Sequence, residues 1–344
     1  MQRRSLLLLS GAAALSAGAV VLLGSGGPPP PETGSAPLMF RDLATRLAAA
    51  ARIEVERHDG RLSVIRQGEA WVLPEKAGYP ARPEKVREVL VGLTELRLTE
   101  PRTSDPAMFE RLGLRDPSRE GSTASLLRVL DETGAVIAEL VVGRRRVRTQ
   151  GNVPESVYVR RPDEDQAWLA EGRLPLDADP QLWIDRDLAS LPRERMLRAE
   201  VSRAGTAPVV LARSEGPDGR LVLVAPPDAP PTEQSSLDNV AGAFEFLTLT
   251  DVRREAEIPG SEAGEARFTL TDGLAIQVRL NQEGEAVWLR LAASGGGEAA
   301  ALNARWRGWA YQVGAWKAKA FLPRLEDLRR EEPARQEPVR APAP

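Results

Sequence analysis

The sequence contains no cysteine among its 344 residues. This absence excludes disulfide bonds, thiolate zinc sites, iron–sulfur clusters, cysteine nucleophiles and a lipidated amino-terminal cysteine. Histidine is almost as scarce, because His58 is the single example in the chain. A site that needs two histidines from one chain is therefore excluded as well.

Lysine is also rare, with four lysines against 42 arginines. An arginine-rich chain can suggest nucleic-acid binding, but the 49 acidic residues outnumber the 46 lysines and arginines and leave a net charge of −3. A chain of this balance lacks the basic excess that a polyanion binder needs. We therefore expect no nucleic-acid partner.

What is present is typical of a folded protein. Hydrophobic residues make up 42% of the chain and charged residues 28%, which is an ordinary globular composition. At roughly 150 residues per domain, the length predicts about two domains.

The amino-terminal residues 1–24 indicate a membrane anchor or an export signal. Arg3 and Arg4 precede an apolar stretch over residues 6–23, which as a helix would span about 27 Å, close to the thickness of a bilayer core. The positive-inside rule then places the amino terminus in the cytoplasm and the rest of the chain outside it. We favour an uncleaved anchor. The alternative is a cleaved signal, since RRSLL resembles a twin-arginine motif and Gly24-Ser25-Gly26 could be cut.

The remaining chain divides by composition into four parts. Residues 25–37 form a Pro/Gly/Ser linker, and residues 331–344 have the composition of a disordered tail. Between them we predict two related units, residues 38–190 and 191–330.

Both units show the same order of strand and helix patterns. Asp59-Gly60 marks a hairpin turn, and a helix is predicted from Pro83, with apolar residues at helical spacing after it. The segment VLVGLTELRLTEPR from Val89 aligns with VAGAFEFLTLTDVR from Val240, which suggests an internal duplication. We therefore predict an α+β fold with two tandem related halves, each a small antiparallel sheet with a packed helix, preceded by one amino-terminal hydrophobic helix.

Three groups of residues are candidates for chemistry. His58 either acts as a general base or lies at the end of an exposed hairpin. Asp185 and Asp187 in WIDRDL either form a paired-carboxylate or oxygen-ligand site or cap a short helix. Trp306, Trp309, Tyr311 and Trp316 either stack on a sugar or protein partner or pack in the core. In each case we favour the structural interpretation.

Three further motifs are interpreted as loops. They are the basic run GRRRVR at Gly143–Arg148, which could alternatively contact an anionic lipid headgroup, the acidic turn PDEDQ at Pro162 and the segment SGGGE at Ser294, which lacks the lysine of a P-loop. No G-x-S-x-G nucleophile motif is present. We predict no catalytic, cofactor-binding or metal-ligating residues, and no cofactor.

Several segments together carry a family resemblance. They are IEVERHDG from Ile53 with Trp71, YPARPEKVREVLVGLTELRL, RLGLRDP, the strand ending LVVG at Gly143, WIDRDLASLP and the carboxyl-terminal GWAYQVGAWKAKAF. In this order they resemble the bacterial domain-of-unknown-function family DUF4340. The resemblance implies single-anchor exported proteins whose genes often lie beside those of gliding-motility-type ABC transporters, and it brings no catalytic residues.

From the leader, the missing catalytic motifs and the resemblance, we expect a non-enzymatic accessory module. It would be anchored in the bacterial inner membrane through residues 1–24, with its bulk in the periplasm, and would bind protein partners beside an ABC-type envelope transporter. If the leader is cleaved, the protein would be soluble in the periplasm. The alternatives are a glycan- or peptidoglycan-binding module that uses Trp309 and Trp316, and a carboxylate-dependent envelope hydrolase.

Overall fold

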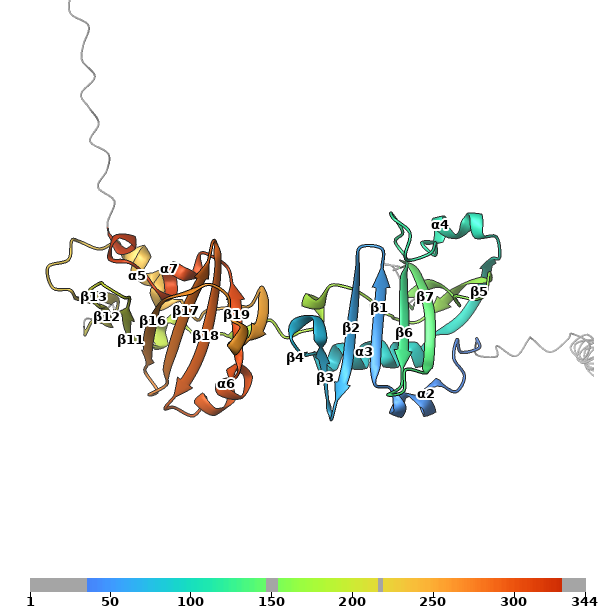
Figure 1. Ribbon diagram of the computed structural model, residues 1–344, viewed down its shortest axis with the longest axis horizontal. Coiled ribbons are helices and arrows are strands. Elements are labelled where there is room, and N and C mark those ends of the chain that lie inside the picture. The colour runs from blue at the N-terminus through green and yellow to red at the C-terminus, as the bar shows by residue number, and fades with distance from the viewer. Residues whose placement is uncertain (1–35, 147–153, 216–218, 330–344) are drawn as a thin grey trace, which may run out of the picture.

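The computed structural model describes residues 36–146, 154–215 and 219–329. Figure 1 shows two bodies side by side in an elongated molecule, each built around one large sheet. The predicted anchor and most of the linker, as well as the tail at 331–344, lie outside the described residues. None of the helices in the described part of the chain has the length and apolarity that a membrane span requires.

The first sheet has nine strands in the order β4-β3-β2-β1-β6-β7-β8-β9-β5. All neighbouring pairs are antiparallel. The strands are β1 (Arg52–Arg57), β2 (Gly60–Gln67), β3 (Ala70–Leu73), β4 (Tyr79–Pro80), β5 (Arg97–Thr103), β6 (Ser125–Leu130), β7 (Val136–Arg146), β8 (Ser156–Arg160) and β9 (Ala167–Glu171).

Apolar and polar residues alternate along β1, and this alternation determines which side chains face the core. Ile53 and Val55 are fully buried on the inner face, as a half-buried strand requires. Glu54 faces the other way, where the guanidinium group of Arg61 on β2 lies 3.0 Å from its carboxylate. The chain then reverses between Arg57 and Gly60, which are register partners. The hairpin turn predicted at Asp59-Gly60 is confirmed.

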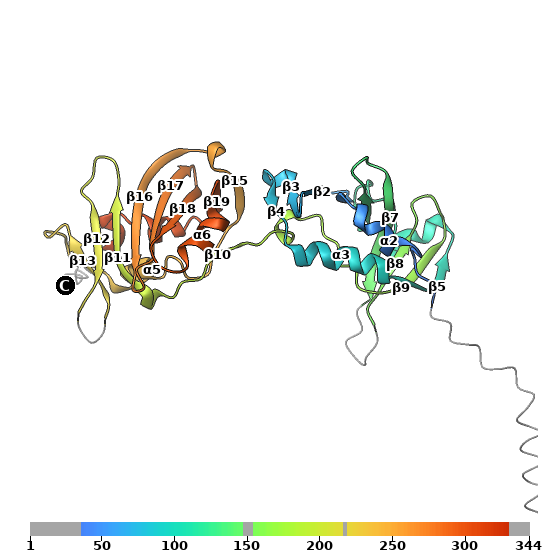
Figure 2. The ribbon, with the colours of Figure 1, turned by 90° about the horizontal axis from the view of Figure 1, so that it is seen from below.

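Helix α3 (Pro83–Glu95) is the longest helix of the described chain. Proline at its first position costs no hydrogen bond, because the first N–H groups of a helix have no intrahelical acceptor. Val86, Val89 and Leu93 are buried on one side, and Figure 2 shows the helix lying along one face of the first sheet. The helix predicted from Pro83 is confirmed.

The second sheet has eight strands in the order β13-β12-β11-β16-β17-β18-β19-β15. Its strands are β11 (Met196–Ser202), β12 (Val209–Arg213), β13 (Leu221–Ala225), β15 (Asp251–Arg254), β16 (Ser261–Leu270), β17 (Ala275–Glu283), β18 (Ala286–Ser294) and β19 (Trp309–Val313). The two sheets follow the same path, because β3-β2-β1-β6-β7-β8-β9-β5 corresponds strand for strand to the second order. In each, a helix (α3, or α5 at Gln234–Ala241) precedes the edge strand β5 or β15.

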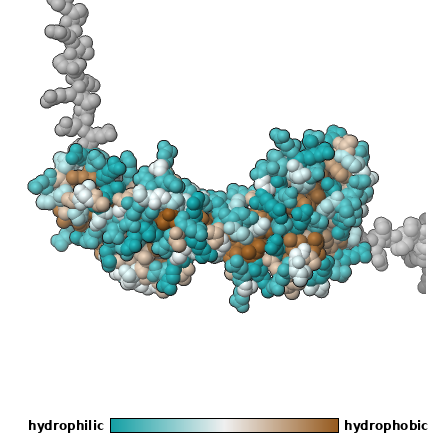
Figure 3. All heavy atoms as spheres, in the orientation of Figure 1, coloured by the Kyte–Doolittle hydropathy of each residue, from teal (hydrophilic) through white to brown (hydrophobic). Residues whose placement is uncertain are grey.

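The remaining helical elements are short. They are α2 (Leu43–Arg46), α4 (Phe109–Leu112), α6 (Ala299–Trp306), α7 (Lys317–Phe321) and the single-turn helices η1 (Leu47–Ala49), η2 (Pro74–Lys76), η3 (Pro106–Met108), η4 (Pro180–Leu182), η5 (Arg193–Arg195), η6 (Glu255–Glu257) and η7 (Leu325–Leu328). A separate two-stranded sheet pairs β10 (Asp187–Ala189) with β14 (Leu247–Thr248). Most of the buried apolar side chains of the two bodies form one connected cluster, and a small second cluster around Phe109 and Val141 lies in the first body. Figure 3 shows apolar patches scattered among hydrophilic side chains on the visible face.

The predicted fold class is wrong. An α+β fold with two small sheets is expected from the sequence, but strand accounts for 42% of the structure, helix for 23%, and the sheets have nine and eight strands. The predicted hydrophobic helix lies outside the described residues and finds no support. Local predictions fail at two places. The segment from Trp183 was expected to be a short helix and instead contains β10, and Gly143–Arg146 continues β7 instead of forming a loop.

Candidate functional site

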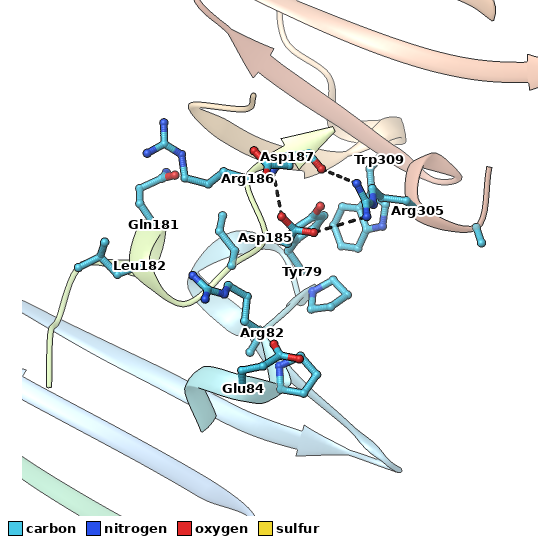
Figure 4. Close-up of a pocket in the computed structure, with 15 residues that line it drawn as sticks. Tyr79, Arg82, Glu84, Gln181, Leu182, Asp185, Arg186, Asp187, Arg305 and Trp309 are labelled. Carbon is cyan, nitrogen blue, oxygen red and sulfur yellow. Dashed lines mark hydrogen bonds and ion pairs between the residues drawn. The ribbon is translucent and has the colours of Figure 1, made fainter. Parts of the chain in front are cut away.

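A cleft of about 790 Å³ lies where the two bodies meet. Its walls come from β4 and the start of α3, from the segment between η4 and β10, and from α6 and β19. Figure 4 shows the side chains of these elements around it. The residues that line it are Tyr79, Pro80, Ala81, Arg82, Pro83, Glu84, Gln181, Leu182, Ile184, Asp185, Arg186, Asp187, Ala304, Arg305 and Trp309.

Aromatic packing holds the base of the cleft together. The rings of Tyr79 on β4 and Trp309 on β19 meet edge to face, with centroids 4.9 Å apart and planes at 81°. This is a favourable geometry for two aromatic quadrupoles. The guanidinium carbon of Arg254 lies 3.9 Å from the centroid of Trp309, a cation–π contact. Both Tyr79 and Trp309 are buried, so this contact joins the two bodies and leaves little aromatic surface for a ligand.

Backbone hydrogen bonds fix the segment that forms the middle wall. The N–H of Arg82 donates to the carbonyl oxygen of Trp183 at 2.7 Å, and Ala81 forms an isolated antiparallel bridge with Ile184. On the other side, the Gln181 side-chain amide donates to the carbonyl oxygen of Thr250 at 2.7 Å. The wall is thus tied to both bodies.

The two predicted carboxylates, Asp185 and Asp187, do lie in this cleft, and Arg305 contacts both residues. One carboxylate oxygen of Asp185 accepts the N–H of Asp187 at 3.0 Å, and the other lies 3.6 Å from Nη2 of Arg305. Nη1 of Arg305 donates to the backbone carbonyl oxygen of Asp187 at 2.6 Å. The carboxylate of Asp185 therefore stabilises a turn and forms an ion pair with Arg305. The favoured interpretation as a helix cap is wrong, because no helix begins here.

The opposite wall carries charge of both signs. Arg82 and Glu84 are exposed at the start of α3, and Figure 4 shows them across the cleft from Asp185. Arg186 is also exposed, and its Nε donates to the carbonyl oxygen of Leu249 at 3.2 Å. With Asp185, Asp187 and Arg305, the cleft holds three guanidinium groups and three carboxylates. Such a lining suits a partner that itself carries both charges.

The predicted aromatic cluster is largely core. Trp306 and Tyr311 are 1% and 0% exposed, and the indole N–H of Trp306 donates to the Leu188 carbonyl oxygen at 3.1 Å. Burial raises the pKa of the Tyr311 hydroxyl far above its usual range. Trp316 alone projects into solvent, at 69% exposure.

His58 lies at the tip of the β1–β2 hairpin, 3.9 Å from the carboxylate of Asp59, and takes no part in the cleft. In the described ranges, no group of three or more His, Cys, Asp or Glu side chains is placed to hold a metal ion. Sequence reasoning missed Tyr79 and Arg82 as lining residues, and it did not bring Arg305 together with Asp185. Tyr79 and Arg82 lie in the segment YPARPEK, from which only the helix at Pro83 and the family resemblance were inferred.

The fold and this site define an antiparallel β protein whose two sheet-centred bodies share a polar cleft. Residues 71–257 match the family described as Domain of unknown function (DUF4340). The match covers more than half of the chain, and the protein belongs to this family. Two of the three cleft walls fall within the match, while Arg305 and Trp309 lie beyond it. No curated protein matches the chain.

Proposed function

We propose that this protein is a non-enzymatic accessory module that binds a segment of a partner protein in the cleft between its two bodies. The observation that carries the proposal is the mixed lining of the cleft, three arginines and three carboxylates beside the exposed apolar side chain of Leu182. Charged groups around an apolar contact are characteristic of protein-binding surfaces, where the charges select the partner and fix its register.

The alternatives receive less support from the same residues. A glycan platform in the cleft needs a free aromatic face, but Trp309 is covered by Tyr79 and by Arg254. Trp316 is exposed but does not line the cleft. A hydrolase needs two carboxylates around a substrate bond, whereas the carboxylate of Asp185 is paired with Arg305, which also binds the backbone carbonyl oxygen of Asp187. Both observations favour binding of protein over carbohydrate chemistry.

The partner we propose is a membrane subunit of an ABC-type envelope transporter. The proposal rests on the family resemblance and on the leader, in which Arg3 and Arg4 precede an apolar stretch. In this arrangement residues 1–24 anchor the chain in the bacterial inner membrane, and both bodies lie in the periplasm. Fractionation with amino-terminal sequencing tests the anchor: recovery of a soluble chain cut near Gly26 would overturn it.

Site-specific photo-crosslinking in cells tests the cleft. A photoreactive amino acid at Leu182, which is 46% exposed in the cleft, is compared with one at Val136, which is 48% exposed on the first body away from it. We expect adducts with a transporter subunit from position 182 only. Equal adducts from both positions, or none from 182, would overturn the proposal.

Charge reversal provides the second readout. Arg82→Glu changes the cleft wall, whereas Arg87→Glu changes an exposed arginine five residues further along, within α3, that does not line the cleft. We expect Arg82→Glu to reduce the adduct from position 182 about tenfold, the effect of converting an attractive charge into a repulsive one. The Arg87 variant should crosslink like the unmodified chain.

A further inference from the structure

A second cavity of about 570 Å³ lies on the second body, away from the cleft. It opens between the β11–β12 hairpin, the Ala263 region of β16 and the chain from Pro323 to Arg329. Most of its lining is apolar. The residues are Val201, Arg203, Ala204, Thr206, Ala207, Val209, Pro226, Ala263, Pro323, Arg324, Leu325, Glu326 and Arg329. A volume of this size is typical of a site for a small molecule.

The inner part of this cavity can accept an apolar chain. Val201 and Val209 are paired across β11 and β12, and both are buried, so they form the floor of the cavity. The half-buried Pro226, Ala263 and Leu325 provide apolar surface that a chain would remove from water. Pro226 and Pro323 lack backbone N–H groups. These walls therefore offer little hydrogen bonding to a peptide backbone, which favours a ligand with an alkyl chain.

The rim is positively charged. Arg203, Arg324 and Arg329 line the cavity with Glu326 as its one carboxylate. Glu326 lies 3.9 Å from Nη1 of Arg324, and both side chains are well exposed, so this pair is weak. Among the described residues, Arg203 and Arg329 form no ion pair with a carboxylate. The rim thus retains positive charge for an anionic group.

Arg203 is held at the edge of the cavity by its own body. One guanidinium nitrogen donates to the carbonyl oxygen of Leu322, while its buried Nε has no hydrogen-bond partner. A Cβ on Gly264 would lie 3.2 Å from Cγ of Arg203 and 2.5 Å from the carbonyl oxygen of Ser202. Because Gly264 has no side chain, there is room beside it for the methylene groups of Arg203.

The electrostatics at Arg203 are consistent with an absent counter-charge. Burial lowers the pKa of Arg203, and the nearby guanidinium group of Arg324 lowers it further. The carboxylate of Asp327 acts in the opposite direction and raises this pKa. Asp327 is engaged elsewhere, since it accepts the N–H of Arg324 at 2.9 Å and lies 3.4 Å from the ammonium group of Lys319. An anion at the rim would offset the repulsion between the two arginines.

We propose that this cavity binds a single-chain amphiphile, with its alkyl chain against Pro226, Ala263 and Leu325 and its anionic head at Arg203, Arg324 and Arg329. The head is a carboxylate or a phosphate, since a guanidinium fork accepts either. The site is separate from the cleft and does not depend on the function proposed for it.

The test uses the full-length chain in amphipol and a dodecanoic acid that carries a diazirine in its alkyl chain. Mass spectrometry locates the crosslinks, and dodecanoate, dodecyl phosphate and dodecanol compete. We expect crosslinks on residues 201–209 and 323–329 that both anionic competitors abolish and dodecanol does not. The stronger of the two anions identifies the head group. Crosslinks spread over the surface, or equal competition by dodecanol, would overturn the proposal.

Three variants make the result specific. Arg324→Gln with Arg329→Gln should weaken binding about tenfold by removing two rim charges, and Ala207→Trp, at an exposed hairpin position, should block the cavity without disturbing the core. Arg119→Gln with Arg307→Gln is the matched control, with two exposed arginines outside the cavity. Equal binding by the rim variant and this control would contradict the assignment, as would displacement of the probe by an apolar peptide but not by dodecanoate.

Discussion

The ammonium nitrogen of Lys76 lies 2.7 Å from Oδ1 of Asp251, although the two residues are 175 positions apart. Lys76 ends η2 on the first body, and Asp251 begins β15 at the edge of the second sheet. Their side chains are 19% and 28% exposed, so water screens the pair only in part. Beside them, Nε of Arg254 donates to the carbonyl oxygen of Ala77 at 3.0 Å. These contacts join the two bodies beside the cleft.

Breaking this ion pair should loosen the junction. We expect Lys76→Met and Asp251→Asn each to lower the free energy of unfolding by about 1–2 kcal/mol, and the double-mutant cycle to give a coupling energy of about 1 kcal/mol. Urea denaturation of the four proteins measures it. The control cycle uses Arg198 and Glu200, which are 2.6 Å apart but each 44% exposed, and should give less than about 0.5 kcal/mol. Equal coupling in the two cycles would contradict the argument from burial.

The aromatic contact at the base of the cleft should matter more than this ion pair. Tyr79 is 4% exposed against Trp309, and burial raises the pKa of its hydroxyl, so the group stays neutral. We expect Tyr79→Ala to lower the free energy of unfolding by about 3–4 kcal/mol, because a large buried ring is lost. Tyr79→Phe keeps the ring and should cost about 1 kcal/mol. Equal losses in thermal or urea unfolding would show that the hydroxyl, not the packing, dominates.

Lys317 predicts a dependence of stability on pH. Its side chain is buried, and its ammonium group donates to the carbonyl oxygens of Ala243 at 2.6 Å and Glu245 at 3.2 Å. Burial lowers the pKa of Lys317 to about 8 from its usual 10.5, and the Glu245 carboxylate opposes the shift. Between these values the unfolded chain binds more protons than the folded one. Stability should therefore be greatest above the unfolded pKa and should decrease as the pH falls to about 8.

The size of this effect follows from the two pKa values and is roughly 3 kcal/mol. Urea denaturation between neutral and alkaline pH measures it. We expect Lys317→Met to abolish this contribution to the pH dependence, so that the difference in stability between the unmodified chain and the variant changes across the window. Lys319→Met is the control, since Lys319 is 76% exposed and two residues away. A constant difference between the chain and the Lys317 variant would contradict the assigned cause.

Gly143 on β7 is required for a close approach of two backbones. A Cβ at this position would lie 2.5 Å from the carbonyl oxygen of Leu112 and 2.9 Å from that of Gly113. Gly113 ends α4 in the left-handed region, with φ at 69°, so this loop cannot shift without losing its cap. We expect Gly143→Ala to lower the free energy of unfolding by about 2 kcal/mol.

Gly60→Ala is the matched control for this substitution. A Cβ on Gly60 would meet no heavy atom within 4 Å, and its backbone is outside the left-handed region. Its effect should stay below about 0.5 kcal/mol. If both alanine variants unfold at the same urea concentration, the close approach at Gly143 does not limit stability.

Helices and hairpin turns could be predicted from the sequence because each depends on residues that are only a few positions apart. The apolar spacing after Pro83 determined α3, and Asp59-Gly60 determined the first hairpin, since helix periodicity and turn geometry involve residues within a few positions. The family could be inferred for the same reason, because each motif is a short run. The absence of cysteine and the single histidine bounded the available chemistry without any structure.

The size of the sheets and the cleft were decided only by tertiary structure. Strand β5 pairs with β9 at the edge of the first sheet, where Arg97 is the register partner of Glu171. The alternation of apolar and polar residues within a strand does not show which distant strand it pairs with. The spacing of Asp185 and Asp187 was visible, but their role depends on Arg305, which arrives from α6 more than a hundred residues later. Tyr79 and Trp309 meet in the same way. Contacts between segments far apart in the sequence form only when the whole chain packs, and these contacts create the cleft.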